Sequence, residues 1–390
     1  MKKLLRYLSP FAPDQSGASG VLYELGGLII ICDAGGCAGN ICGFDEPRWF
    51  TKKSAVFSAG LRDMDAIMGR DDKLIAKLAK AQESVNGKFT AIIATPVPAV
   101  IATDMKALKR MAEKKIGIPC ITINAIGTRY YDEGEEEAWL SLAQEFAGTF
   151  DTDRDEDKNT ESPEGSDTIK IIKNFDFSNK TLVLGASPLE TGYTSSGPLE
   201  EACRAYQIEE PVILGMTPSD DSLTALDLVR ASDKYKEILI VSPAGLKAAK
   251  YLNATYGIPY KVGYPFIPER VIKDLKAAIA SDKDNRAPRI LIIHSQFAAN
   301  QLRNNIIKTM SDESFNPSID CASFFMQSPD YMEEKDFRLN DEDQLFDIAA
   351  NNSYDYIVGD KDIKLLLKAA GFKGTFIEYN HYAISGEGSL

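Results

Sequence analysis

The chain has 390 residues, of which 44% are hydrophobic, and carries a formal net charge of −13 at pH 7. This length exceeds what one hydrophobic core usually organises, so we expect two or three domains. The acidic balance argues against a nucleic-acid partner, because binding a polyanion needs a concentrated basic surface. The apolar stretch 25–32 is far too short to cross a bilayer, which takes ~20 apolar residues. The basic start is interrupted by Ser9 and Pro10 before it reaches signal-peptide length, so we expect neither secretion nor a membrane anchor.

Short β-branched runs that end in Gly, Pro or Ser predict buried parallel strands, and amphipathic stretches between them predict helices. The first third of the chain gives strands at 28–32, 90–94 and 119–124, with helices at 72–83 and 104–115. The middle gives strands at 181–185, 211–214 and 238–242, with a helix at 197–206. The last part gives strands at 290–294 and 356–359, with a helix at 297–310. This alternation predicts doubly wound α/β units.

Two polar stretches, 151–167 and 281–288, interrupt the alternation, and a fresh strand follows each of them. We therefore predict three Rossmann-like domains with parallel sheets: residues 1–165, which include the acidic linker, then 166–284 and 285–390. The carboxyl ends of their strands are expected to converge on a central crevice that can hold a substrate. His294 ends one of these strands, and we interpret it as a hydrogen-bonded structural histidine.

Six cysteines, at positions 32, 37, 42, 120, 203 and 321, are too sparse for a disulfide framework in so long a chain. Free thiols in a reducing compartment fit better, so we expect a cytoplasmic protein. Cys120, Cys203 and Cys321 are scattered along the chain and are interpreted as packing residues. The other three fall within eleven residues, which calls for a local explanation.

The cysteine loop places Cys32 at a strand end, Cys37 after the turn Gly35-Gly36, and Cys42 five residues later. Iron–sulfur clusters are held by cysteine thiolates, and neighbouring glycines let backbone N–H groups approach the cluster sulfurs. We therefore predict Cys37, Cys42 and Cys32 as cluster ligands, with Gly36 beside them. Zinc is a weaker interpretation, because structural zinc sites pair ligands two to four residues apart and no histidine is near. Cys32 also fits a small buried hydrophobe.

With these residues the chain resembles the nitrogenase component 1 family. Gly35-Gly36-Cys37 is similar to the family's cysteine turn, and segments 54–65 and 95–105 resemble two further family segments. Leu184-Gly185, Ile292-Ile293-His294 and the stretch 355–359 are similar to the strand ends of the family's later domains. The sequence departs from the family by having no cysteine before Cys32 and by carrying Pro96 where the family has a ligand cysteine. Only Cys37 matches residue for residue.

The resemblance implies an oxidoreductase with a 4Fe–4S cluster near Cys37. It also implies that a separate ATPase delivers the electrons, which agrees with the absence of a Walker A lysine, and that this partner docks over the first domain. Trp49 and Phe50 fit that docking surface or ordinary packing equally well. Cys37 and Cys42 from two chains can complete a four-ligand site across a two-fold axis. The alternatives are Cys32 with a non-cysteine ligand, or thiols from a heteromeric partner related to this chain.

Two other functions fit the same sequence. The first is a non-catalytic scaffold or carrier for cluster or metallocofactor assembly, since two of the family's cysteine positions are lost. The second is a metal-free, ligand-binding α/β protein. The substrate cannot be derived from the sequence, because fold does not fix function.

Overall fold

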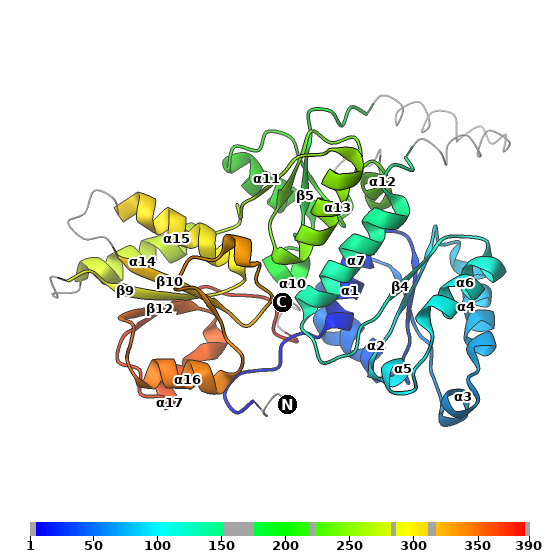
Figure 1. Ribbon diagram of the computed structural model, residues 1–390, viewed down its shortest axis with the longest axis horizontal. Coiled ribbons are helices and arrows are strands. Elements are labelled where there is room, and N and C mark those ends of the chain that lie inside the picture. Colours follow the sequence, from blue (N-terminus) through cyan, green and yellow to red (C-terminus); the bar gives the residue numbers. More distant parts are fainter. Residues whose placement is uncertain (1–4, 151–174, 219–222, 282–285, 311–316, 387–390) are drawn as a thin grey trace.

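The computed structural model describes residues 5–150, 175–218, 223–281, 286–310 and 317–386. These residues form three sheets, and every pairing between named strands is parallel. The sheets with their helices make three lobes, coloured blue to cyan, green, and yellow to red in Figure 1. The α/β fold class predicted from the sequence is thereby confirmed. The acidic stretch 151–167 and the proposed boundaries at 165/166 and 284/285 lie outside the described residues.

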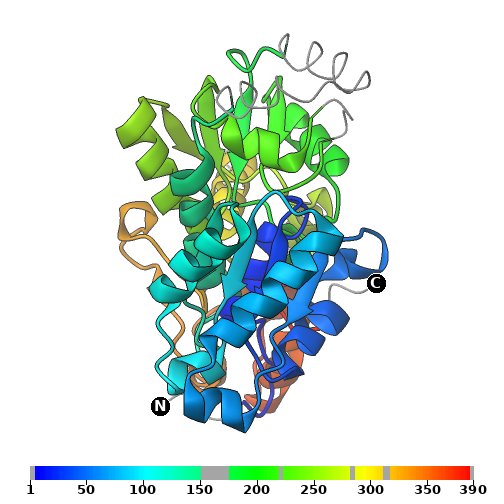
Figure 2. The same cartoon turned by 90° about the vertical axis from the view of Figure 1, so that its right-hand side faces the viewer.

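The first lobe holds a four-stranded sheet in the order β2-β1-β3-β4. Helices α4 and α6 pack on one face, as Figure 2 shows from that side, and α1 and α7 pack on the other. Its strands are β1 (Leu28–Ile31), β2 (Ala55–Ser58), β3 (Thr90–Ile93) and β4 (Cys120–Ile123). Its α-helices are α1 (Asp14–Leu22), α2 (Gly36–Asn40), α3 (Asp63–Met68), α4 (Asp71–Val85), α5 (Pro96–Val100), α6 (Met105–Ile116) and α7 (Tyr131–Phe146).

The second lobe holds a four-stranded sheet in the order β6-β5-β7-β8. The strands are β5 (Thr181–Leu184), β6 (Pro211–Ile213), β7 (Glu237–Ile240) and β8 (Tyr260–Val262). The helices are α10 (Pro188–Thr191), α11 (Ser196–Ala205), α12 (Ala225–Arg230), α13 (Leu246–Tyr256) and α14 (Glu269–Ser281), the last of which packs against β13 of the third lobe.

The third lobe holds a five-stranded sheet in the order β11-β10-β9-β12-β13. The strands are β9 (Arg289–Ile293), β10 (Ser318–Ser323), β11 (Phe337–Arg338), β12 (Tyr356–Gly359) and β13 (Thr375–Glu378). The helices are α15 (Gln296–Met310), α16 (Glu342–Ala350) and α17 (Lys364–Ala369).

The eight strands and four helices predicted from periodicity are all present, with ends shifted by at most two residues. Central strands such as β1, β3 and β5 are buried along their whole length, which produces the continuous apolar runs that the sequence shows. Strands β2, β8, β10, β11 and β13 were not predicted from the pattern. They are short, partly exposed or rich in polar residues, so they carry no such run.

The lobes share buried contacts around the centre of the molecule. Helix α1 lies directly on α7, and one apolar cluster extends through residues of all three lobes. The segment before α1 crosses to the third lobe, where the backbone N–H groups of Arg6, Tyr7 and Leu8 donate to the carboxylate of Glu342. Within the described ranges, no helix is both long and apolar enough to span a bilayer.

Candidate functional site

The cysteine loop follows β1 and folds into three short helical segments: α2, the π-helix η1 (Ile41–Asp45) and the 3₁₀-helix η2 (Pro47–Phe50). Asp33 fixes its start, since its carboxylate accepts hydrogen bonds from Ala38 N at 2.8 Å and from Ser58 Oγ at 2.6 Å. Gly35 has φ of 124°, a conformation that side chains rarely adopt, so the turn before Cys37 depends on glycine. The loop is therefore a defined structure anchored to the sheet.

The three predicted ligands occupy two different environments. Cys32 is buried with Leu28 and Ile30 on the sheet face covered by α4 and α6. Cys37 in α2 is half-buried and packs against the cluster on the opposite face. Cys42 in η1 is also half-buried. The structure thus places Cys37 and Cys42 on one continuous helical segment and directs Cys32 into the core behind it.

Burial decides the charge of these thiols in the isolated chain. It raises the pKa of Cys32 to about 12 and, together with the charge of Glu46, that of Cys42 to about 11. Burial also raises the pKa of Cys37. All three are therefore thiols at neutral pH, and a metal must displace their protons to bind them.

Open space surrounds the backbone of the loop glycines. A Cβ atom added at Gly35, Gly36, Gly39 or Gly43 would meet no other atom within 4 Å. This segment can therefore approach a bulky inorganic group with its backbone exposed. Among the described residues, however, no set of three His, Cys, Asp or Glu side chains is arranged to hold a metal ion. One chain accordingly offers two half-buried thiols on adjoining helical segments beside an open glycine surface.

Large apolar side chains are exposed on the elements next to these thiols. We call Phe44, Trp49, Phe50 and Phe57 the aromatic patch; their exposed fractions are 57%, 37%, 74% and 41%. They lie on η1, η2 and β2, and η1 and β2 pack against α2, the helix that carries Cys37.

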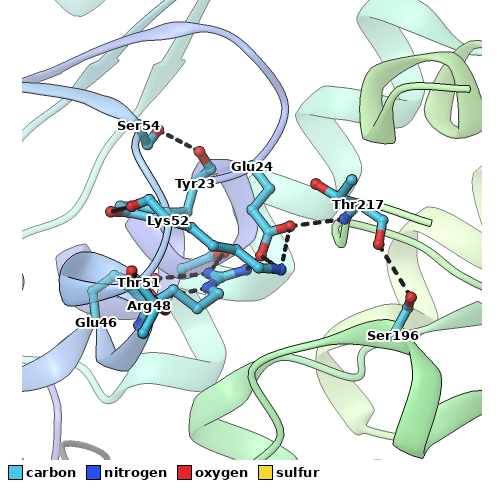
Figure 3. Close-up of polar contacts among 10 residues, drawn as sticks. Tyr23, Glu24, Glu46, Arg48, Thr51, Lys52, Ser54, Ser196 and Thr217 are labelled. Atoms are coloured by element: carbon cyan, nitrogen blue, oxygen red, sulfur yellow. Dashed lines mark hydrogen bonds and ion pairs between the residues drawn. The ribbon is translucent and has the colours of Figure 1, made fainter. Parts of the chain in front are cut away.

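A buried charged network, which sequence reasoning missed, lies directly after Cys42 (Figure 3). Arg48 is fully buried and donates to both carboxylate oxygens of Glu46 at 2.7 Å, to Glu24 at 3.1 Å and to the carbonyl of Gly20 at 2.6 Å. Glu24 also accepts from Thr217 N of the second lobe at 2.8 Å. The network therefore fixes the loop to the second lobe. It was missed because the sequence does not show which charged residues are buried.

A second polar cluster, which we call the junction cluster, lies where the lobes meet. It consists of Tyr131 from α7, Glu190 from α10, and His294, Ser295 and His381 from the third lobe. His294 is buried and its Nε2 lies 3.1 Å from the carbonyl oxygen of Asn380, so the predicted hydrogen bond is present, while its structural role stays a prediction. Tyr131 and Glu190 were not predicted, because neither ends a strand nor belongs to a motif.

Two hollows adjoin the junction. The first is a largely apolar cavity of about 30 Å³ whose walls include His294, His381 and Phe325, and it is large enough for little more than water. The second is an open groove of about 570 Å³ to which all three lobes contribute charged or polar side chains. That volume is typical of sites for small molecules, which favour domain interfaces. The groove is lined by Arg129, Glu133, Glu136, Glu137, Leu140, Lys247, Met326, Gln327 and Arg338.

Comparison with known proteins gives one family and a set of solved structures. The family model for nitrogenase component 1 type oxidoreductases matches residues 15–270. A structure described as nitrogenase Cp1 at pH 6.5 has a TM-score of 0.63 and 11% identity, covering 100% of this chain and 92% of that one. A second, described as nitrogenase Cp1 at pH 5, has a TM-score of 0.61 and 14% identity, covering 100% and 88%. At these identities the structures establish the fold alone, and no curated protein matches the sequence. Because the family model matches well over half of the sequence, the chain belongs to the nitrogenase component 1 type oxidoreductase family.

Proposed function

We propose that this protein is the electron-accepting subunit of a two-component reductase, and that two copies hold one 4Fe–4S cluster between them through Cys37 and Cys42. The observation that carries the proposal is the pair of half-buried thiols on one helical segment, beside glycines with open space around them. Such clusters take four cysteine thiolates, whereas one chain places only two in accessible positions. An isologous two-fold interface supplies the other two.

The aromatic patch supports a second copy as the occupant of this surface. A two-fold contact through Phe44, Phe50 and Phe57 would bury apolar side chains that are otherwise exposed to water. Burying them would also exclude water from the thiols, which strengthens thiolate–iron interactions and the hydrogen bonds that tune the cluster. The same surface could instead pair with a related chain, and that partner would then supply its own cysteines to the cluster.

Bound in this way, the cluster would supply single low-potential electrons. The chain's own residues keep the loop in place: Asp33 anchors its start, and Arg48 at its end binds Glu24, which accepts a hydrogen bond from Thr217 N of the second lobe. Electrons would come from a separate ATP-dependent reductase, as the family membership suggests, and the groove at the three-lobe junction is the candidate substrate site. All six cysteines are free thiols, which supports a protein that functions in the reducing cytoplasm.

The experiment is anaerobic reconstitution with iron and sulfide, followed by iron and sulfide analysis. We expect the double variant Cys37→Ala, Cys42→Ala to lose nearly all cluster, because it removes both thiolates from each chain and so all four proposed ligands of the dimer. The matched control is Cys120→Ala, Cys203→Ala, which removes two cysteines that are fully buried in the first and second lobes. A C37A/C42A protein that retains as much iron and sulfide as the control would refute the assignment.

A cluster carrier is the second candidate, and the position of the thiols favours it. A cluster held at the surface by two half-buried thiols per chain can be released to another protein more easily than one enclosed in a core. The two functions differ in one measurement. A carrier transfers its cluster to an apo-ferredoxin and shows no turnover with a reductase and ATP, whereas a reductase subunit keeps its cluster and oxidises the reduced partner.

A further inference from the structure

Glu190 lies at the point where the three lobes touch. Its Oε2 accepts a hydrogen bond from the Tyr131 hydroxyl of the first lobe at 2.7 Å, and its Oε1 accepts one from the Ser295 hydroxyl of the third lobe at 2.5 Å. Tyr131 is in turn 2.9 Å from Nε2 of His381. All four side chains are buried. One carboxyl group of α10 therefore connects the second lobe to both others.

The surroundings of Glu190 contain no positive charge to balance an ionised carboxylate. Among the described residues, Glu190 forms no ion pair with lysine or arginine, and Nε2 of His381 is 3.8 Å away. Burial lowers the pKa of both His294 and His381 to about 3, so both rings are neutral. The titratable groups that face Glu190 are Tyr131, Asp132 and Glu135 of α7, Tyr264 of the second lobe, and His294, Tyr379 and His381 of the third.

The neighbouring carboxyls make ionisation still less favourable. Glu135 is fully buried one helical turn after Tyr131; burial raises its pKa well above the usual value, although the Ser187 hydroxyl and the charge of Arg48 oppose this. Asp132 accepts from Met326 N of the third lobe at 2.5 Å and is also buried. Glu190, Asp132 and Glu135 repel one another when charged, and protonation removes that repulsion.

We propose that Glu190 is a proton-binding site that locks the three lobes together when it is protonated and weakens their junction when it is ionised. This inference goes beyond the redox assignment and does not depend on it. It makes the domain arrangement sensitive to pH through one carboxyl group.

The pH range follows from the direction of the shift. Burial raises the pKa of Glu190 from 4.5 to about 7, although its bonds to Ser295 and Tyr131 oppose this. Between these two values the folded protein holds a proton that the unfolded chain releases, so stability falls as pH rises. Above the folded pKa both states are ionised and the contribution of Glu190 becomes constant. Asp132, whose pKa burial also raises to about 7, adds a decline in the same range.

Thermal unfolding of the full chain between pH 5 and 8.5 tests the proposal. We expect Glu190→Gln, which mimics the protonated acid, to have a higher Tm than wild type by a margin that grows up to pH 7 and then stays constant. Glu201→Gln, at an exposed position of α11, should follow the wild-type curve. Adding Asp132→Asn to Glu190→Gln should reduce the remaining decline, and Glu135, whose pKa burial also raises, contributes the rest. A pH-independent difference between E190Q and wild type would overturn the proposal.

Tyr131→Phe gives an independent measurement that remains informative even if E190Q does not fold. It removes a hydrogen bond that lowers the pKa of Glu190, so the decline in Tm should move to higher pH. The infrared C=O band of a protonated carboxyl should likewise persist to higher pH than in wild type. A Tm decline and an infrared titration unchanged in position would show that Glu190 is not the group that titrates.

Discussion

Replacing Arg48 by Met is expected to destabilise the protein by about 3–5 kcal/mol, because it leaves the buried carboxylates of Glu46 and Glu24 without their shared cation. Arg48 is completely buried, and its contacts at 2.7 Å with both oxygens of Glu46 form a bidentate pair. Lys52, at 2.9 Å from Glu24, compensates only that carboxylate. The measurement is the midpoint of the first unfolding transition in guanidinium chloride for wild type and R48M.

Arg270→Met is the matched control for this prediction. Arg270 lies 3.8 Å from Asp274, one turn later on α14, and 4.0 Å from Glu378, and its side chain is 65% exposed. Exposed pairs of this type contribute about 0.5 kcal/mol or less. If R48M and R270M unfolded at the same denaturant concentration, the buried network of Figure 3 would not be what fixes the cysteine loop to the second lobe.

Replacing Gly134 by Ala is expected to cost more than about 3 kcal/mol, because the new methyl group overlaps the backbone of a neighbouring helix. A Cβ at Gly134 would lie 1.8 Å from the carbonyl oxygen of Asp14 in α1. The reciprocal position, Gly17, would place a Cβ 2.0 Å from the carbonyl oxygen of Tyr131 in α7. Backbone atoms cannot rotate away, so α1 and α7 must separate. Loss of soluble protein or a large drop in Tm is the expected readout.

The control is Gly197→Ala in α11, where an added Cβ would meet no atom within 4 Å. Helix propensity alone favours alanine over glycine by up to about 1 kcal/mol. G197A should therefore be neutral or more stable, although the chemical change is the same as in G134A. Equal Tm values for the two variants would contradict the close approach of α1 and α7.

The sequence predicted the fold well because parallel strands that are buried on both faces leave a continuous apolar run. Strand β1 and strand β5 are examples, and their ends differ from the prediction by one residue. Strand β10 was missed because polar residues alternate with apolar ones in Ser318–Ser323, so it lacks the run that marks a central strand. Its place in the sheet is determined by its pairing with β9, which is a tertiary contact.

The candidate site was predicted less completely than the fold, because residue spacing does not show to which face of a sheet a side chain points. Spacing alone grouped Cys32 with Cys37 and Cys42, but the side chain of Cys32 points to the sheet face opposite the one against which Cys37 packs. Its role as a ligand stays a prediction, as do those of Cys37 and Cys42. The network of Arg48 and the junction around Glu190 were missed because charged side chains are normally exposed, and only tertiary structure shows that these are buried.

The number of chains and iron atoms in one assembly tests the shared cluster most directly. Native mass spectrometry of the anaerobically reconstituted protein should show a dimer with about four irons and four sulfides per two chains, as four thiolates from two copies require. In the C37A/C42A variant this mass should disappear. A monomer that carries a complete four-iron cluster, or a dimer that binds iron equally well without both cysteines, would contradict the account.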